Sequence, residues 1–346
     1  MPGGADVIVI GAGIAGCAAA RALTAKGASV IVIEARDRIG GRIWSVDGFD
    51  HGAHWIHGTE GNPLTTLAHQ WRLPLLFVGG DCSYVGGWDR LHFPAADAPD
   101  KDASIIAADR LFDALEEYRA KDALRSAGDQ SLASAAAALC AKLAPDKTTS
   151  TAAQWHLNLL ARDDCAADSR TFSLHGWDEG YEVHGYGDSV LPGGMQQLVE
   201  RMADGLDVRL NEVVTAIAYD NDGCRITTGS GEWHAGHVIV TVPLGVLKCG
   251  ALAFDPPLPT AKQDAIDRLG YGNLTKVRVL FDAPFWKPQQ YAFGLYPPDG
   301  APAPTIAVNQ MLLGDAPGLI MPIGAPDGPW IEQLDESALH DPNFAT

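Results

Sequence analysis

The feature that most constrains this chain is a strand, a glycine-rich turn, a helix and a second strand near its N-terminus. Residues 6–10 (DVIVI) form a short β-branched run, and the hexapeptide GAGIAG at 11–16 follows it at once. The alanine-rich stretch that follows predicts a helix ending at Lys26 and Gly27, and the run ASVIVIEA at 28–35 predicts a second buried strand. This order is typical of a parallel βαβ crossover.

The spacing of the glycines in this turn predicts a dinucleotide site. Gly11 permits a tight turn, Gly13 lets backbone amides approach a pyrophosphate, and Gly16 allows the helix to pack closely on the strand. Glu34 ends the second strand, where its carboxylate can accept hydrogen bonds from both ribose hydroxyls. The alternative is a tight turn followed by a surface glutamate, which leaves this spacing a coincidence.

Length and composition allow two domains and argue against nucleic acid as a partner. The chain has 346 residues, of which 47% are hydrophobic and 20% charged, and a single core stops growing near about 250–300 residues. Its 43 acidic and 25 basic residues give a net charge of −18. This charge repels phosphate backbones and would attract cationic substrates if it gathered near a cleft. A role in solubility alone is the competing interpretation.

The cysteines and the N-terminus bear on the compartment. The six cysteines are scattered without CxxC spacing, which fits free thiols in a reducing compartment and shows no zinc cluster. No basic segment precedes the first apolar run, and glycines interrupt that run. We therefore expect neither a signal peptide nor a membrane span, and by default a cytoplasmic protein.

The run ARDRIGGRIWS at 35–45 resembles the extended FAD signature of the flavin-containing amine oxidase family and related flavoproteins. Glycines relieve steric limits beside a cofactor, and arginines offer fixed forks to phosphate or carbonyl oxygens; surface arginines in a loop are the alternative. The resemblance implies that FAD is the cofactor. In this part of the chain it implies contacts from Gly11, Gly13, Ile14, Ala15, Gly16, Glu34, Ala35, Arg36, Gly40, Gly41 and Arg42.

The segment FDHGAHWIHGTEGNPL at 49–64 resembles the polyamine oxidase form of the loop that runs over the flavin. Asp50 stands at the acid position of that pattern, and His51 stands where the family more often has an apolar residue. The resemblance implies that His57 faces the substrate, where a near-neutral pKa would let it hydrogen-bond an amine or tune its protonation. The residues that it implies along the isoalloxazine are Gly52, Ala53, His54 and Trp55.

Two other interpretations of these histidines stay open. His51, His54 and His57 could be zinc ligands, although their regular spacing of three in a loop is not a usual zinc pattern. They could also be ordinary loop histidines. The cofactor prediction includes no metal.

Two later segments continue the resemblance. Residues 190–217 resemble the return of the chain into the FAD domain, where the backbone of Val214 would meet the adenine. Residues 272–286 (GNLTKVRVLFDAPFW) resemble the lysine motif of the family, in which Lys276 would hold a water against flavin N5. From the pattern alone, an exposed lysine on an edge strand is the simpler interpretation, because a lysine on a buried strand needs a partner or a water.

The resemblance implies an α/β fold in which a Rossmann-like FAD-binding domain is interleaved with an α+β substrate-binding domain, as in amine oxidases and glutathione reductase-like FAD proteins. We expect the FAD-binding domain to comprise 1–70 and 186–252, and the substrate domain 71–185 and 253–346. Nothing after Trp286 matches the last FAD-binding stretch of the family, so we expect this chain to lack that segment. Its loss would expose apolar surface and weaken cofactor retention. A missing C-terminal segment or self-association would then complete the molecule.

The function that the resemblance implies is FAD-dependent oxidation of a primary or secondary amine, with a polyamine as the preferred substrate, to an imine and then an aldehyde. Small-molecule amine and O2 would be its partners, and H2O2 a product. Four carboxylates are candidates to anchor a second ammonium group: Asp178, Glu179, Glu182 and Asp188. The alternatives are an L-amino acid oxidase and a non-catalytic remnant or subunit that needs a partner segment.

Overall fold

The computed structural model describes residues 4–80, 89–92, 101–122, 128–143, 146–176, 184–296, 304–314 and 316–334. They form two compact units whose chain segments alternate. The first unit takes the described residues within Met1–Ile56, Gly61–Leu76 and Ser189–Tyr271. The second takes those within His57–Glu60, Phe77–Asp188 and Gly272–Thr346.

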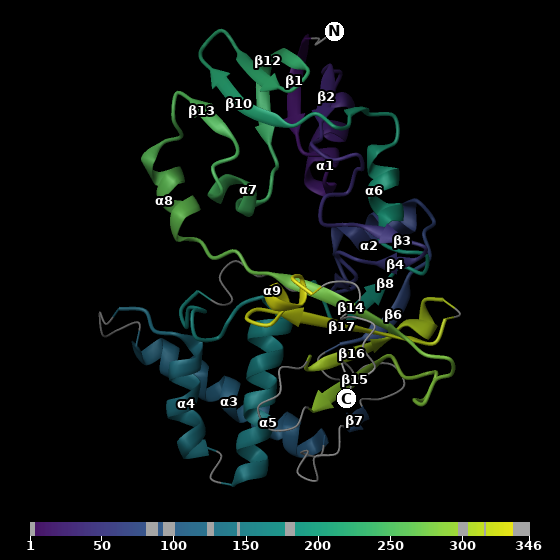
Figure 1. The fold of residues 1–346 in the computed structure, drawn as a ribbon, viewed down its shortest axis with the longest axis vertical. Helices are drawn as coiled ribbons and strands as arrows, with labels where there is room; N and C mark the ends of the chain where they lie inside the picture. Colours follow the sequence, from purple (N-terminus) through teal and green to yellow (C-terminus); the bar gives the residue numbers. More distant parts are fainter. Residues whose placement is uncertain are drawn as a thin grey trace. The chain divides into compact units, whose positions relative to one another are not determined.

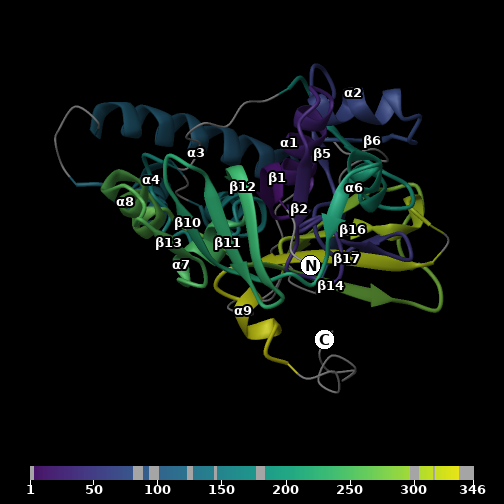
Figure 2. The same cartoon turned by 90° about the horizontal axis from the view of Figure 1, so that it is seen from above.

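The first unit is built on a seven-stranded sheet of described residues (Figure 1). In spatial order its strands are β13 (Ala253–Asp255), β10 (Val214–Tyr219), β11 (Cys224–Thr228), β12 (Gly231–Val240), β1 (Gly4–Ile10), β2 (Val30–Ile33) and β9 (Asp207–Arg209). Strand β1 pairs in parallel with both β12 and β2, and β2 pairs in parallel with β9. Antiparallel pairing joins β10, β11 and β12, which lie side by side in Figure 2.

The alternation of side chains along β1 explains why both faces of this sheet are covered. Val7 and Val9 lie in a buried cluster with residues of α1 (Ile14–Thr24) and α6 (Gln196–Ala203). Ile8 and Ile10 point to the other face and pack in a cluster that includes Trp233. The other helices of this unit are α2 (Pro63–Gln70), α7 (Leu244–Lys248) and α8 (Thr260–Arg268).

The second unit combines a mainly antiparallel sheet with a group of helices. The sheet runs in the order β14 (Leu274–Leu280), β17 (Gly318–Gly324), β16 (Ile306–Asn309), β15 (Ala292–Tyr296) and β7 (Asp89–His92). The helices α3 (Lys101–Asp122), α4 (Leu132–Leu143) and α5 (Lys147–Asn158) share a core that contains Leu111, Leu115, Leu132 and Leu157. A π-helix, η1 (Leu159–Asp164), continues α5, and the short helices η2 (Gln310–Leu312) and α9 (Gly328–Ile331) follow later in the chain.

Two small sheets complete the described structure. Strands β3 (Ser45–Val46) and β4 (Phe49–Asp50) form an antiparallel pair. Strands β5 (Ile56–His57), β8 (Asp188–Val190) and β6 (Leu76–Gly79) form a three-stranded sheet at the points where the chain passes from one unit to the other. Across the described residues, no helix is both long enough and apolar enough to span a bilayer.

Candidate functional site

The turn after β1 has a backbone that only glycine accommodates at two of its positions. Gly11 has a φ of +104°, in the left-handed region. A Cβ atom at Gly16 would overlap the carbonyl oxygen of Gly11, because the first turn of α1 packs directly on the end of β1. The close approach that the sequence predicts for this turn is thus a property of its backbone.

Gly13 differs, because the space beside it is open. A Cβ atom at Gly13 would meet nothing nearer than the Gly40 carbonyl oxygen, 3.9 Å away. Gly13 is the N-cap of α1, where none of the described side chains caps the helix, and Ile14 and Ala15 are the first helical residues. Gly13 also forms a β-bridge with Gly40. The uncapped helix end beside an open glycine has the room and the partial positive charge that a pyrophosphate requires.

Glu34 follows β2 directly and is buried, with 7% of its surface exposed. Its Oε2 accepts a hydrogen bond from the Ala12 amide at 2.8 Å, and its Oε1 accepts one from the Arg36 amide at 2.9 Å. Each carboxylate oxygen has a second lone pair, so these bonds leave room for hydroxyl donors. The predicted role of Glu34 toward a ribose stays a prediction.

The segment after β9 lies against the same region. The Glu212 amide donates to the Glu34 carbonyl at 2.9 Å. Val214, the predicted adenine contact, then begins β10 with a half-buried side chain. Ala35 and Arg36 are exposed. The fold therefore brings the predicted adenine-side residues of two distant segments to one edge of the sheet.

Arg38, which the sequence analysis did not single out, organises the loop that contains Gly40, Gly41 and Arg42. Its guanidinium donates to the carbonyl oxygens of Ile39 at 3.3 Å, Gly41 at 3.1 Å and Ile43 at 3.3 Å. It also lies over the Trp44 ring, 4.8 Å from the centroid. The sequence shows only that Arg38 lies between Glu34 and the paired glycines. It does not show that the side chain binds backbone carbonyls of its own loop, because such bonds require no particular residue type at the acceptor positions.

Replacing Arg38 with methionine should loosen this loop without disturbing the core of the sheet. Three hydrogen bonds from a charged donor are lost, although part of that energy is recovered by water because the side chain is half-buried. We expect a loss of about 1–3 kcal/mol in the free energy of unfolding and weaker retention of FAD. Thermal melting and the flavin content after gel filtration measure the two effects. An Arg36→Met variant, which removes an exposed arginine nearby, is the matched control for stability.

The exposed Arg42 contributes its backbone to the next predicted cofactor segment. Its carbonyl oxygen accepts a hydrogen bond from the Ala53 amide at 3.0 Å. A Cβ atom at Gly52 would overlap that same carbonyl oxygen. The two stretches in which the resemblance places flavin contacts are therefore joined through backbone groups.

A buried polar network holds His54. Its Nδ1 lies 3.0 Å from Oδ2 of Asp50, and both residues are 2% exposed. Oδ1 of Asp50 accepts hydrogen bonds from the Ser45 hydroxyl and, at 2.8 Å, from the Met195 amide. His54 also packs edge-on against Trp55, with ring centroids 4.8 Å apart. This network fixes the predicted isoalloxazine loop to the start of α6.

Gln196, at the first position of α6, carries a buried acceptor that the sequence analysis missed. Its Oε1 has no hydrogen-bond partner among the described residues. The same atom would lie 3.1 Å from a Cβ atom built at Gly40. A buried carbonyl oxygen without a donor is unfavourable, and a bound group with hydroxyls could supply one here. Together with the uncapped helix end, it is an observation that fits a large polar cofactor in this unit.

The three regularly spaced histidines do not converge. His51 stacks on the Trp44 ring, with centroids 4.4 Å apart, whereas His54 binds Asp50 and His57 binds Asp188. Among the described residues, no group of three or more potential ligands is arranged to hold a metal ion.

His57 lies in the second unit, at the end of β5, and its side chain is 59% exposed. Its Nδ1 lies 2.9 Å from Oδ1 of Asp188, the first residue of β8. The hydrogen bond to Asp188 raises the pKa of His57 above its usual value, and the charges of Asp188 and Asp164 act in the same direction against desolvation. Of the four carboxylates predicted as ammonium anchors, Asp178, Glu179 and Glu182 lie outside the described residues.

Lys276 lies in the middle of β14, opposite Pro322 of β17. Its side chain is half-buried, and β14 is the outermost strand that the structure describes on this side of the sheet. The sequence pattern alone suggested an exposed lysine on an edge strand. Lys276 does lie on an edge strand of the described sheet, but its side chain is half-buried. The predicted role of Lys276 toward the flavin stays a prediction.

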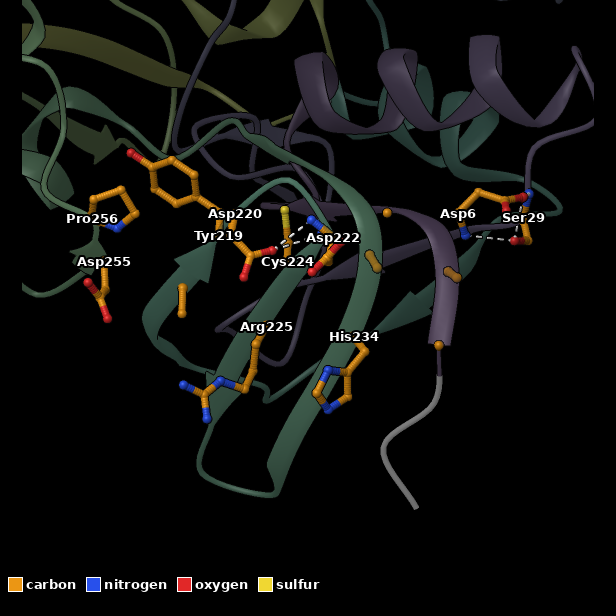
Figure 3. A pocket seen from close by; sticks show the side chains of 16 residues that line it. Asp6, Ser29, Tyr219, Asp220, Asp222, Cys224, Arg225, His234, Asp255 and Pro256 are labelled. Carbon is orange, nitrogen blue, oxygen red and sulfur yellow. Dashed lines mark hydrogen bonds between the residues drawn. The ribbon is translucent and has the colours of Figure 1, made fainter.

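An open cleft of about 930 Å³ lies in the first unit at the end of β1 opposite the glycine turn (Figure 3). Its polar groups serve the local backbone: Asp6 accepts hydrogen bonds from the amide and hydroxyl of Ser29, and Asp220 accepts them from the amides of Asp222 and Gly223. The lining includes none of the predicted site residues.

Comparison with known proteins gives concordant results. The pattern of the family described as flavin containing amine oxidoreductase matches residues 14–329. Polyamine oxidase 4 of Oryza sativa subsp. japonica is 34% identical over 303 residues, covering 81% of this chain and 60% of the relative. Lysine-specific histone demethylase 1 homolog 1 of Arabidopsis thaliana is 34% identical over 310 residues, covering 84% of this chain and 35% of the relative.

A solved structure of a putrescine oxidase double mutant has the same fold, with a TM-score of 0.74 at 22% identity over 98% of this chain and 80% of that one. The α/β FAD fold predicted from the sequence is thereby confirmed. The chain spans between about a third and three fifths of the length of these two curated relatives. The chain therefore belongs to the flavin-containing amine oxidoreductases, and the FAD cofactor predicted from its sequence is the cofactor of its family.

Proposed function

We propose that this chain forms the FAD-binding and amine-binding parts of an amine oxidase whose preferred substrate is a polyamine. The carbon next to the amine nitrogen is oxidised, the resulting imine is hydrolysed to an aldehyde, and O2 is reduced to H2O2. The observation that carries the proposal is the family match over residues 14–329, together with a relative named polyamine oxidase. The net charge of −18 is consistent with a cationic substrate.

The residues that would hold the cofactor are in the first unit. The uncapped start of α1 and the open Gly13 would take the pyrophosphate, and Glu34 the adenosine ribose. The loop that Asp50 anchors would border the flavin. A bound flavin supplies the two-electron acceptor for the oxidation. The chain itself has to bind and orient the amine, and His57 of the second unit is our candidate for contact with the amine nitrogen.

A second substrate class follows from the relatives named lysine-specific histone demethylases, which are as similar to this chain as the polyamine oxidase. A monomethylated lysine side chain is a secondary amine, so the same chemistry applies to it. A methyl-lysine peptide is therefore the proper competitor in any substrate test, and L-amino acids are a third arm.

The test is a reductive titration of the full chain loaded with FAD. We expect a flavin absorbance band near about 450 nm that bleaches on anaerobic addition of spermine or spermidine, with less bleaching by a methyl-lysine peptide or an L-amino acid. Faster bleaching by the peptide would replace the polyamine with the second substrate class. A chain that acquires no flavin band after FAD is added would contradict the proposal that this polypeptide is an enzyme by itself.

A further inference from the structure

Two glycine-containing loops of the second unit, residues 57–60 and residues 184–188, meet along their backbones. The Gly58 amide donates to the Gly187 carbonyl at 2.7 Å, and the Glu60 amide donates to the His184 carbonyl at 2.9 Å. A Cβ atom at Gly58 would overlap the His184 carbonyl. The loops can approach this closely only because glycine stands there.

The bond between Gly58 and Gly187 places the residues on either side of it together. His57 precedes Gly58, and Asp188 follows Gly187, so the backbone pairing brings the imidazole and the carboxylate within 2.9 Å. The Tyr186 hydroxyl also donates to the Gly80 carbonyl at 2.9 Å, which fixes the second loop to the end of β6. The backbone contacts of the two loops thus position His57 and Asp188 for their hydrogen bond.

The hydrogen bond assigns the imidazole a tautomer. An ionised carboxylate can only accept, so neutral His57 must carry its proton on Nδ1. Nε2 is then an acceptor, on a ring that is 59% exposed, whereas the Asp188 side chain is 17% exposed. An acceptor in this position can take an N–H of an ammonium group.

Charge acts on His57 from two elements. Asp188 on β8 and Asp164 at the end of η1 both favour the protonated ring. Glu60, His184 and Tyr186 are the other ionisable residues of the described parts of the two loops. An amine substrate is itself a cation at neutral pH, so a protonated His57 would repel it, whereas Nε2 of a neutral His57 can accept a hydrogen bond from its ammonium group.

We propose that Asp188 is a positioning residue for His57: it orients the ring, fixes the Nδ1–H tautomer and sets the pH above which Nε2 can accept a substrate ammonium. This inference rests on the proposed function for the identity of the ligand, but the pairing itself does not. It gives Asp188, the one described residue of the four carboxylates considered as direct ammonium anchors, a role exerted through the histidine.

The experiment is nitrogen NMR of the full, FAD-loaded chain labelled at its 11 histidines. The His57 signal is identified by its absence from a His57→Gln variant. In the wild-type chain we expect the Nδ1–H tautomer at high pH, and an Nε2–H tautomer would overturn the proposal without any further variant. In Asp188→Asn, the measured pKa of His57 should fall by about 0.5–1, and an unchanged value would also overturn it.

An Asp164→Asn variant is the matched control, because it removes a carboxylate charge that acts on His57 from another element. We expect a smaller fall in the His57 pKa and the same tautomer. With spermine as substrate, the acid limb of the pH profile of kcat/KM should move to lower pH in Asp188→Asn by the same amount as the His57 pKa. A chain that oxidises no amine would fail the proposed function, and the tautomer and titration would still decide the role of Asp188.

Discussion

The Gly13→Val variant should fold as the wild-type chain does and lose FAD. Gly13 has an extended backbone, with φ −74° and ψ 175°, that valine also adopts. A Cβ atom there meets nothing nearer than the Gly40 carbonyl oxygen at 3.9 Å, so the branch point of the added side chain is accommodated. A bound pyrophosphate would occupy that space. We expect FAD affinity to fall at least about 100-fold, equivalent to about 2.7 kcal/mol, measured by fluorescence titration of the apoprotein.

Gly16→Val is the matched comparison for this result. A side chain at Gly16 would overlap the Gly11 carbonyl oxygen and approach Thr241 Oγ1 to 2.8 Å, so α1 would have to move away from β1. We expect Gly16→Val to lower the melting temperature much more than Gly13→Val, whose cost is limited to a poorer N-cap of α1. Normal FAD binding by Gly13→Val would remove the pyrophosphate site from the start of α1.

The Asp163→Ala variant should be destabilised by about 3–5 kcal/mol, the usual cost of breaking a buried ion pair from one side. Asp163 is 6% exposed, and its Oδ1 lies 3.0 Å from Nε of Arg162. Its Oδ2 accepts hydrogen bonds from the Thr305 hydroxyl and, at 3.1 Å, from the Thr305 amide. The change would leave Arg162 with Asp327 as its remaining ion-pair partner, at 3.2 Å. Urea unfolding followed by tryptophan fluorescence gives the free energy.

Asp163→Asn should cost much less, about 1–2 kcal/mol. Burial raises the pKa of Asp163 more strongly than Arg162 and Thr305 lower it, so the fold gains little from the charge itself. An asparagine oxygen can still accept from Thr305. Equal losses in the two variants would mean that the charge, and not the hydrogen bonds to Thr305, stabilises this part of the second unit.

The same cluster lies in the π-helix that follows α5. In η1, Arg162 pairs with Asp327, and Asp163 accepts a hydrogen bond from Thr305. Asp164 is exposed, and its charge raises the pKa of His57. A π-helix inserts one extra residue per turn and so changes which side chains share a face. The two neighbouring acids therefore have different roles: Asp163 makes buried contacts within the second unit, and Asp164 contributes charge near His57.

The sequence by itself determined the features whose causes are local. The βαβ unit could be predicted from residues 6–34, because strand periodicity, the left-handed φ at Gly11 and the contact between Gly16 and Gly11 all act within a few residues. The family and its FAD cofactor could be predicted because the residues of each motif are contiguous in the sequence.

Only the tertiary structure decided which side chains meet across long sequence separations. His57 and Asp188 are 131 positions apart, and Asp50 and Met195 are 145 apart. Nothing in the composition around Asp188 indicated its partner, since the contact with His57 depends on backbone hydrogen bonds between two glycine-containing loops. Hydrogen bonds depend on distance and direction in space, and a sequence specifies neither until the strands that carry the partners have paired.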